Sequence, residues 1–208
     1  VEEYWVIDLL ATFIVFFAVI DPIGTVPIFI AVTKGYDDAS KRKIALIAIC
    51  VSAAILLFFV IAGELILTAL GIPLSAFQIA GGIVLFLFAL SMIFGESKPE
   101  EELKLVKNHN DTAVFPLAVP SIAGPGAMLT VVLLTDGSRF NLWEQFQTVV
   151  VMLSVLLLVY VLMLGSNYIN KLIGSGGASV VSRVMGLILA AVATTNTLEG
   201  IKLYFGLS

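Results

Sequence analysis

Two short stretches combine residues that interrupt a helix with residues that can bind a small polar ligand. The first is Asp21-Pro22-Ile23-Gly24-Thr25-Val26-Pro27, and the second is Pro120-Ser121-Ile122-Ala123-Gly124-Pro125-Gly126. Each lies inside an apolar run, where a continuous helix is otherwise expected. Interrupted hydrophobic segments at corresponding places in the two halves of a membrane protein indicate a transporter's binding site.

The residue types at the breaks predict the start of a half-helix in each. Asp21 is a good N-cap and Pro22 suits the first helical position. Such a start presents free N–H groups and a positive dipole end, which suit a carboxylate, while the carbonyls that end the preceding half-helices suit an ammonium group. We therefore predict a small zwitterion such as an amino acid, bound by residues at the two breaks: Asp21, Pro22, Ile23, Gly24, Thr25, Ser121, Ala123, Gly124, Gly126 and Ala127.

Asp21 allows two interpretations at this stage. Capping the N-terminus of a helix is by itself a sufficient role for an aspartate. An ionisable group in the middle of a membrane span is, however, a functional hypothesis by default, here a proton carrier. Both interpretations stay open.

The last apolar run adds a polar cluster, Thr194-Thr195-Asn196-Thr197. Counted from Val184, Thr194 lies about 15 Å deep, near the middle of a bilayer. Threonine can bond to its own helix, but an asparagine at this depth needs a partner, so we place Thr194, Thr195 and Asn196 at the substrate site.

Two glutamates are expected nearer the outer surface, Glu64 in the second apolar run and Glu199 in the last. Both are candidates for proton coupling beside Asp21, or for a role in an outer gate. We favour the gate or interface for Glu64 and leave Glu199 open.

The composition predicts a polytopic helical membrane protein with one domain. Of 208 residues, 60% are hydrophobic and only 12% are charged, against about 25% charged residues in soluble domains. The net charge of −4 argues against nucleic-acid binding. Motifs for a zinc hydrolase, a serine hydrolase or a phosphate-binding loop do not occur, so we expect no enzyme activity, cofactor or metal.

We expect six spans, with a flexible connector over the glycine- and serine-rich residues 174–179. Lysine and arginine concentrate in the loops after spans one, three and five, which places these loops in the cytoplasm and both termini outside. The predicted spans are approximately 8–33, 44–70, 75–94, 112–135, 146–169 and 184–204.

The two halves align when the first is shifted by 102 positions, so that Gly24 falls on Gly126 and Thr33 falls on Thr135. Three spans per half require the second half to be inserted upside down, which predicts a 3+3 inverted repeat with spans one and four broken. Repeat 1 covers about 1–95, repeat 2 about 110–208, and 96–111 is a cytoplasmic linker. The repeat favours a broken crossing at each interruption, with a re-entrant hairpin as the alternative.

The two interrupted segments resemble the signature segments of the MarC family. The resemblance rests on residues 21–29 and 116–127, is supported by 183–191, and extends over essentially the whole chain. It implies a six-span, multi-pass protein of the prokaryotic inner membrane. The short loops and the cluster at 194–197 favour the SnatA-like archaeal branch.

That branch implies a proton-coupled symporter of small neutral amino acids such as glycine and alanine. Its partners would be the substrate, protons and the lipid bilayer, with no nucleic acid. The alternatives are an exporter of amino acids or other small solutes, and a membrane scaffold or channel-like module without a transport cycle.

Overall fold

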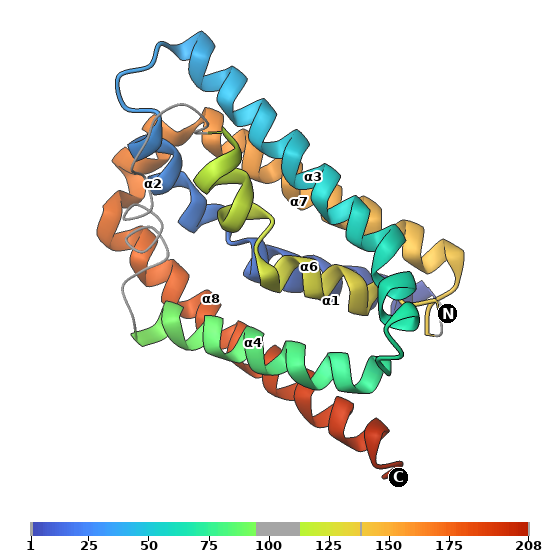
Figure 1. Ribbon diagram of the computed structural model, residues 1–208. Coiled ribbons are helices and arrows are strands. Elements are labelled where there is room, and N and C mark those ends of the chain that lie inside the picture. Colours follow the sequence, from blue (N-terminus) through green and yellow to red (C-terminus); the bar gives the residue numbers. More distant parts are fainter. Residues whose placement is uncertain (1, 95–112, 138, 208) are drawn as a thin grey trace.

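The computed structural model describes residues 2–94, 113–137 and 139–207, and every regular element in these ranges is helical (Figure 1). The predicted linker at 96–111 lies outside the described residues. Five helices are long and apolar enough to span a membrane, or six with the bent pair η2–α6, as expected for a polytopic protein. The elements are α1 (Glu2–Ile20), α2 (Pro22–Val32), α3 (Asp38–Ala69), α4 (Leu74–Phe94), η2 (Ala113–Ile122), α6 (Pro125–Leu134), α7 (Leu142–Leu164) and α8 (Ser166–Tyr204).

The first predicted break is confirmed. Helix α1 ends at Ile20, and Asp21 has a left-handed backbone with φ 50° and ψ 68°. Helix α2 then begins at Pro22, whose fixed φ and missing N–H suit the first helical position. The two helices together form one span, Leu9–Val32.

The second break is also present, but its first half differs from the prediction. Phe115 and Val119 have extended backbones inside η2, each directly before a proline. A proline disfavours helical geometry in the preceding residue, so η2 is irregular and not a regular half-helix. The following helix, α6, begins at Pro125 after a bend of 54°.

The path through η2 and α6 favours the broken crossing over the re-entrant hairpin. A bend of 54° is too small to turn the chain back on itself. Figure 1 shows the segment continuing from the end of the bundle near α2 to the end near the start of α7.

Local sequence signals set the starts of two long helices. The Asp37 carboxylate accepts hydrogen bonds from the N–H groups of Ala39 and Ser40 at the start of α3. Hydrogen bonds from the side chain and the backbone of Ser40 hold the pKa of this carboxyl below its usual range. At the start of α7, Asn141 and Glu144 form a capping box.

The predicted flexible connector at 174–179 is wrong, because the backbone of α8 is helical throughout Ser166–Tyr204. Glycine lowers helix propensity by only about 1 kcal/mol per residue, which tertiary contacts override. Helix α8 makes such contacts with α2, α4 and α7. Its membrane-long part is Ser179–Tyr204, close to the predicted span.

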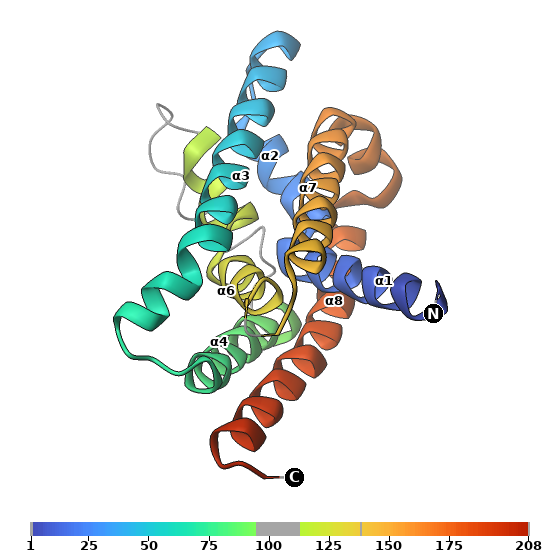
Figure 2. The ribbon, with the colours of Figure 1, turned by 90° about the vertical axis from the view of Figure 1, so that its right-hand side faces the viewer.

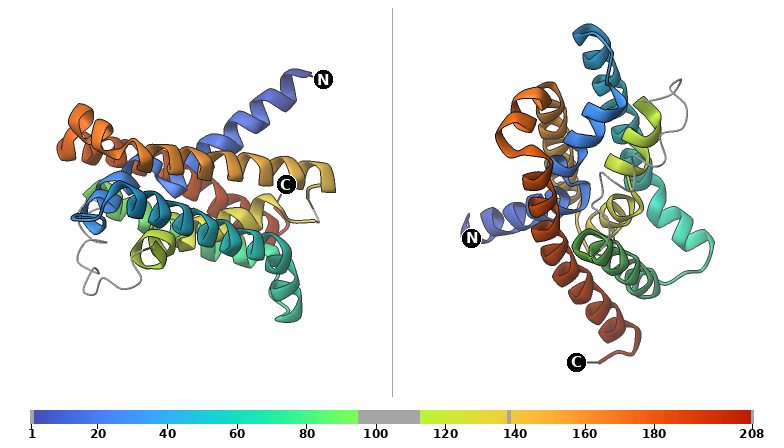
Figure 3. Two further views of the ribbon diagram at one scale, coloured as in Figure 1. Left: turned by 90° about the horizontal axis from the view of Figure 1, so that it is seen from above. Right: turned by 90° about the vertical axis from the view of Figure 1, so that its left-hand side faces the viewer.

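The broken spans lie in the middle of the molecule, between two helix pairs. Helix α1 contacts α6, and α2 contacts η2. Helices α3 and α7 run side by side on one flank, and α4 and α8 on the other (Figures 1 and 2). Both termini lie at the end of the bundle where α7 begins (Figures 1 and 3).

Small residues bring α4 and α8 close together in an antiparallel pair. A Cβ atom on Gly82 would lie only 2.9 Å from the Ala193 carbonyl oxygen and would collide with the Thr197 hydroxyl. A Cβ atom on Gly186 would lie 3.1 Å from the Ala89 carbonyl oxygen. Membrane helices associate closely through such positions.

We expect Gly82→Ala to destabilise the fold by about 1–3 kcal/mol, because the added methyl group overpacks the α4–α8 contact. The matched control is Gly176→Ala in α8, where an added Cβ atom meets nothing within 4 Å. That change should stabilise the helix slightly, by about 0.5–1 kcal/mol. Thermal unfolding of the purified variants in detergent measures both effects. Equal melting temperatures for Gly82→Ala and Gly176→Ala would contradict close packing of α4 against α8.

Candidate functional site

Asp21 lies at the centre of the molecule, where α1 ends and α2 begins. Its side chain is fully buried, with 0% exposure. One carboxylate oxygen accepts a hydrogen bond from the Gly24 N–H at 3.0 Å, and the other accepts from the Ser182 hydroxyl of α8 at 3.1 Å. Asp21 is therefore both the cap of α2 and a link to the last span.

Gly24 makes this geometry possible. A Cβ atom at Gly24 would collide with the Asp21 carboxylate and would lie 3.0 Å from the Ser182 hydroxyl oxygen. Glycine at this position therefore leaves room for the hydrogen bond between Asp21 and Ser182.

Hydroxyl groups connect this centre to the second broken span. The Thr25 hydroxyl donates to the Asp21 carbonyl oxygen at 3.1 Å and lies 3.3 Å from the Ser121 hydroxyl of η2. The Ser52 hydroxyl of α3 donates to the Ala118 carbonyl oxygen at 3.4 Å. Residues from both halves of the chain thus form one polar centre, which we call the central polar cluster: Asp21, Thr25, Ser52, Ser121 and Ser182.

The central polar cluster is closed in this conformation. Thr25 and Ser52 are 0% exposed, and Ser121 is 1% exposed. The predicted residues around it are also enclosed to a large extent: Pro22, Ala123, Gly126 and Ala127 are buried, while Ile23 and Gly124 are half-buried.

The second half-helix starts differently from the first. Its N-cap, Gly124, provides no side-chain hydrogen bond to α6, whereas Asp21 caps α2. A Cβ atom at Gly124 would lie 2.7 Å from the Pro120 carbonyl oxygen, and one at Gly126 would lie 2.8 Å from a Leu85 methyl carbon. Glycine thus permits close backbone approach at the N-terminus of α6.

Figure 1 shows α2 and α6 leaving the centre toward opposite ends of the bundle. Their N-termini, with the positive ends of their dipoles, therefore both point to the centre. The arrangement matches the sequence prediction, with one anionic side chain already present at α2 and none capping α6.

The structure does not bring the polar cluster of α8 to the centre. Thr194 and Thr195 have exposed side chains, and their hydroxyl groups donate to Ala190 and Ala191 carbonyl oxygens of their own helix. Asn196 is half-buried. Thr194 follows Ser182 by twelve residues, which is about 18 Å along a helix.

Ser182 is the residue of α8 that sequence reasoning missed. It lies before the predicted start of span six at 184, because the helix extends further toward its N-terminus than hydropathy indicates. A small polar residue next to Arg183 gives no signal of burial. Only the crossing of α8 over the first break places Ser182 against Asp21.

The two glutamates lie away from the centre, in exposed positions. The Glu64 carboxylate accepts a hydrogen bond from the Gly137 N–H at 3.0 Å. Gln78 of α4, which is buried, donates to Glu199 at 3.4 Å and accepts from Arg139 at 2.8 Å.

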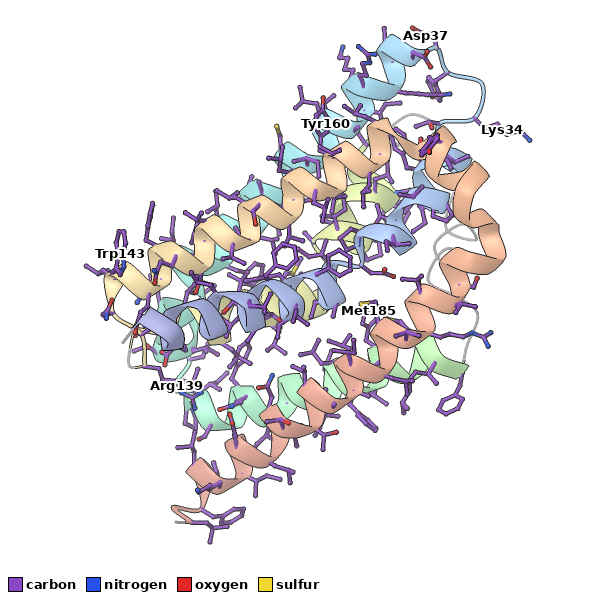
Figure 4. All side chains as sticks on the ribbon, turned by 180° about the vertical axis from the view of Figure 1, so that it is seen from behind. Lys34, Asp37, Arg139, Trp143, Tyr160 and Met185 are labelled. Atoms are coloured by element: carbon purple, nitrogen blue, oxygen red, sulfur yellow. The ribbon has the colours of Figure 1, made fainter. Side chains whose placement is uncertain are left out.

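Figure 4 shows Arg139 and Trp143 at the end of the molecule opposite Lys34 and Asp37.

Residues 7–205 match the family described as MarC family integral membrane protein. The chain is 35% identical over 195 residues to the UPF0056 membrane protein YvbG of Bacillus subtilis, covering 91% of this chain and 92% of that protein. It is 33% identical over 189 residues to a UPF0056 membrane protein of Methanocaldococcus jannaschii, covering 89% and 92%.

A UPF0056 membrane protein of Aquifex aeolicus is 32% identical over 209 residues, covering 97% of this chain and 95% of its own length. No solved structure matches the chain. Relatives from Bacteria and Archaea are similar to a comparable degree, so the comparisons identify a family and no branch within it. This multi-pass protein belongs to the MarC family of integral membrane proteins.

Proposed function

We propose that this protein is a secondary transporter of small neutral amino acids such as glycine and alanine, coupled to protons. The observation that carries the proposal is the central polar cluster, where two half-helices begin and a fully buried aspartate lies in mid-span. Ionisable groups at this depth are costly and mark substrate or ion pathways. Discontinuous helices at the midplane are typical of transporter binding sites.

The contacts between elements support an inverted repeat, in which α1–α2 corresponds to η2–α6, α3 to α7, and α4 to α8. Most of the observed contacts then have a counterpart, whereas those of α8 with α1 and α7 have none among the main contacts of the described residues. Helix α1 contacts α6 as α2 contacts η2, and α7 contacts both parts of the first broken span as α3 contacts both parts of the second. Helices α4 and α8 contact each other, as do α3 and α7.

The asymmetry of the two half-helix starts suggests how a zwitterion would bind. The N-terminus of α2 already holds the Asp21 carboxylate. The N-terminus of α6 has no side-chain cap and is therefore the place for the substrate carboxylate. The substrate ammonium would then lie toward Asp21 and the Ala118 carbonyl oxygen, which Ser52 already contacts.

The close packing around the site restricts the substrate to a small molecule. Gly126 approaches Leu85 and Val19, and Ala123 and Ala127 are fully buried. A substrate with a long side chain would need to displace these groups. Glycine and alanine require the least displacement.

A hollow of about 300 Å³ between α1 and α7 provides a candidate approach from the end that holds the termini. Its lining includes the polar side chains of Thr12, Glu144, Gln147 and Thr148 and reaches Val15. Val15 precedes Asp21 by six residues, about 9 Å along a helix. In alternating access, movement of one repeat against the other would join this hollow to the central polar cluster.

Purified protein in liposomes should accumulate labelled glycine when a pH gradient is imposed. A protonophore should abolish the accumulation, and protein-free liposomes provide the background. Absence of glycine uptake or exchange under any gradient, in either direction, would contradict the transport proposal.

Ser182→Ala and Thr194→Ala each remove one hydroxyl group from α8 and distinguish a substrate site at the central polar cluster from one at Thr194. Loss of Ser182 leaves a buried carboxylate oxygen of Asp21 without this donor, so we expect glycine uptake to fall about tenfold, in line with about 1–3 kcal/mol for a buried unsatisfied group. Thr194→Ala should change uptake less than about twofold, as for an exposed position. A larger loss of glycine uptake in Thr194→Ala than in Ser182→Ala would place the substrate site near Thr194 instead.

Asp21→Asn separates the role of a cap from that of a proton carrier. Asparagine also caps helices and tolerates a left-handed backbone, so the protein should fold with a similar melting temperature. We expect exchange of glycine across the membrane to persist, with weaker glycine binding because the charge facing the substrate ammonium is lost, while accumulation driven by the pH gradient is abolished. Unchanged proton-driven accumulation would leave Asp21 as a cap alone.

A further inference from the structure

A second cavity, of about 290 Å³, lies at the end of the molecule opposite the termini, where α3 begins, α7 ends and α8 begins. Figure 4 shows Tyr160 of α7 near this end, which also carries Lys34 and Asp37. The deep side of the cavity is formed by Phe29 and Met163, which are 2% and 0% exposed.

The polar lining of the cavity consists mainly of hydrogen-bond donors. Lys41 and Arg42 contribute two positive charges, and Tyr160 and Ser166 contribute hydroxyl groups. Asp38 is the one acidic lining residue. Within the described part of the chain, neither Lys41 nor Arg42 forms an ion pair.

Ser166 contributes a buried hydroxyl group to the lining of the cavity. Its side chain is only 6% exposed, and no described residue hydrogen-bonds its hydroxyl. It is also the first residue of α8, whose N-cap Gly165 supplies no side-chain hydrogen bond. A helix start, a buried hydroxyl and two cations therefore converge on the same space.

We propose that this cavity binds a phosphate group, supplied by the headgroup of an anionic phospholipid. A guanidinium group matches phosphate geometry with two parallel hydrogen bonds, and a lysine adds a point charge. The hydroxyls of Tyr160 and Ser166 can donate to the remaining phosphate oxygens.

The position of the cavity at the ends of α3 and α7, two helices long and apolar enough to span a membrane, favours a lipid as the source. Leu164 lines the cavity and is 45% exposed, and Leu46 and Ile47 of α3 are also exposed, so acyl chains have apolar surface on both flanking helices. Basic pockets between membrane helices on the cytoplasmic side bind anionic headgroups. The concentration of lysine and arginine in the flanking loops predicts that this end is cytoplasmic.

The test measures binding of phosphatidylglycerol and phosphatidylcholine to the purified full chain by native mass spectrometry. We expect wild type to retain phosphatidylglycerol in preference to phosphatidylcholine, and Lys41→Gln/Arg42→Gln to bind phosphatidylglycerol about tenfold more weakly. The matched control, Lys34→Gln/Lys43→Gln, removes the same charge at the same end but from residues outside the cavity lining, and should change binding less than about twofold. Equal losses in both double variants would show a general charge effect and overturn the site.

Two further measurements separate the sources of the phosphate and exclude a folding artefact. Ser166→Ala keeps both cations and should weaken phosphatidylglycerol binding about threefold, as expected for a lost hydrogen bond of moderate strength. Inorganic phosphate is added to lipid-free protein in detergent and the melting temperature is recorded. A rise in wild type that is absent in Lys41→Gln/Arg42→Gln, without any lipid preference, would assign the site to free phosphate. No response to either ligand, from protein that melts cooperatively, would overturn the proposal.

Discussion

The structure depends on one constraint, that a backbone interrupted in the middle of a membrane must satisfy its polar groups within the protein. Asp21 meets this need at the first break: its carboxylate accepts the Gly24 N–H, and its carbonyl oxygen accepts from Thr25. At the second break, the Ala118 carbonyl oxygen accepts the Ala123 N–H and the Ser52 hydroxyl. Polar side chains gather here because the interrupted backbone requires them.

The same constraint ties distant parts of the chain together. Thr25 lies beside Ser121, and Asp21 accepts from Ser182, so the first broken span is joined by hydrogen bonds to the second and to α8. Each of these contacts crosses between the two proposed repeats. A rocking movement of one repeat against the other would have to exchange these contacts for others, and a bound polar substrate can supply them. The closed cluster and the proposed transport cycle are thus two consequences of the same interrupted backbone.

Local signals in the sequence predicted much of this arrangement. Asp21-Pro22 and Gly124-Pro125 determine where α2 and α6 begin, because capping and proline geometry act within a few residues. The lengths of the apolar runs in the sequence predicted the membrane spans. The contact between Asp21 and Ser182 joins positions 161 residues apart, and it depends on how α8 crosses the first break, which hydropathy does not encode. Thr194 was placed at the centre by depth alone, but depth does not say which face of a helix meets its neighbours.

The hydrogen bonds of Asp21 are compatible with both of its interpretations, as a cap and as a proton carrier. As a cap it accepts from Gly24, and as a link between repeats it accepts from Ser182. An ionised carboxylate only accepts hydrogen bonds, whereas a protonated one also donates. In the proposed proton-coupled cycle, a proton arriving at Asp21 would therefore change its hydrogen bonds at the start of α2 and to α8 at the same moment. The proposed cycle thus rests on the residue that begins the half-helix, because its carboxylate contacts both the start of α2 and α8.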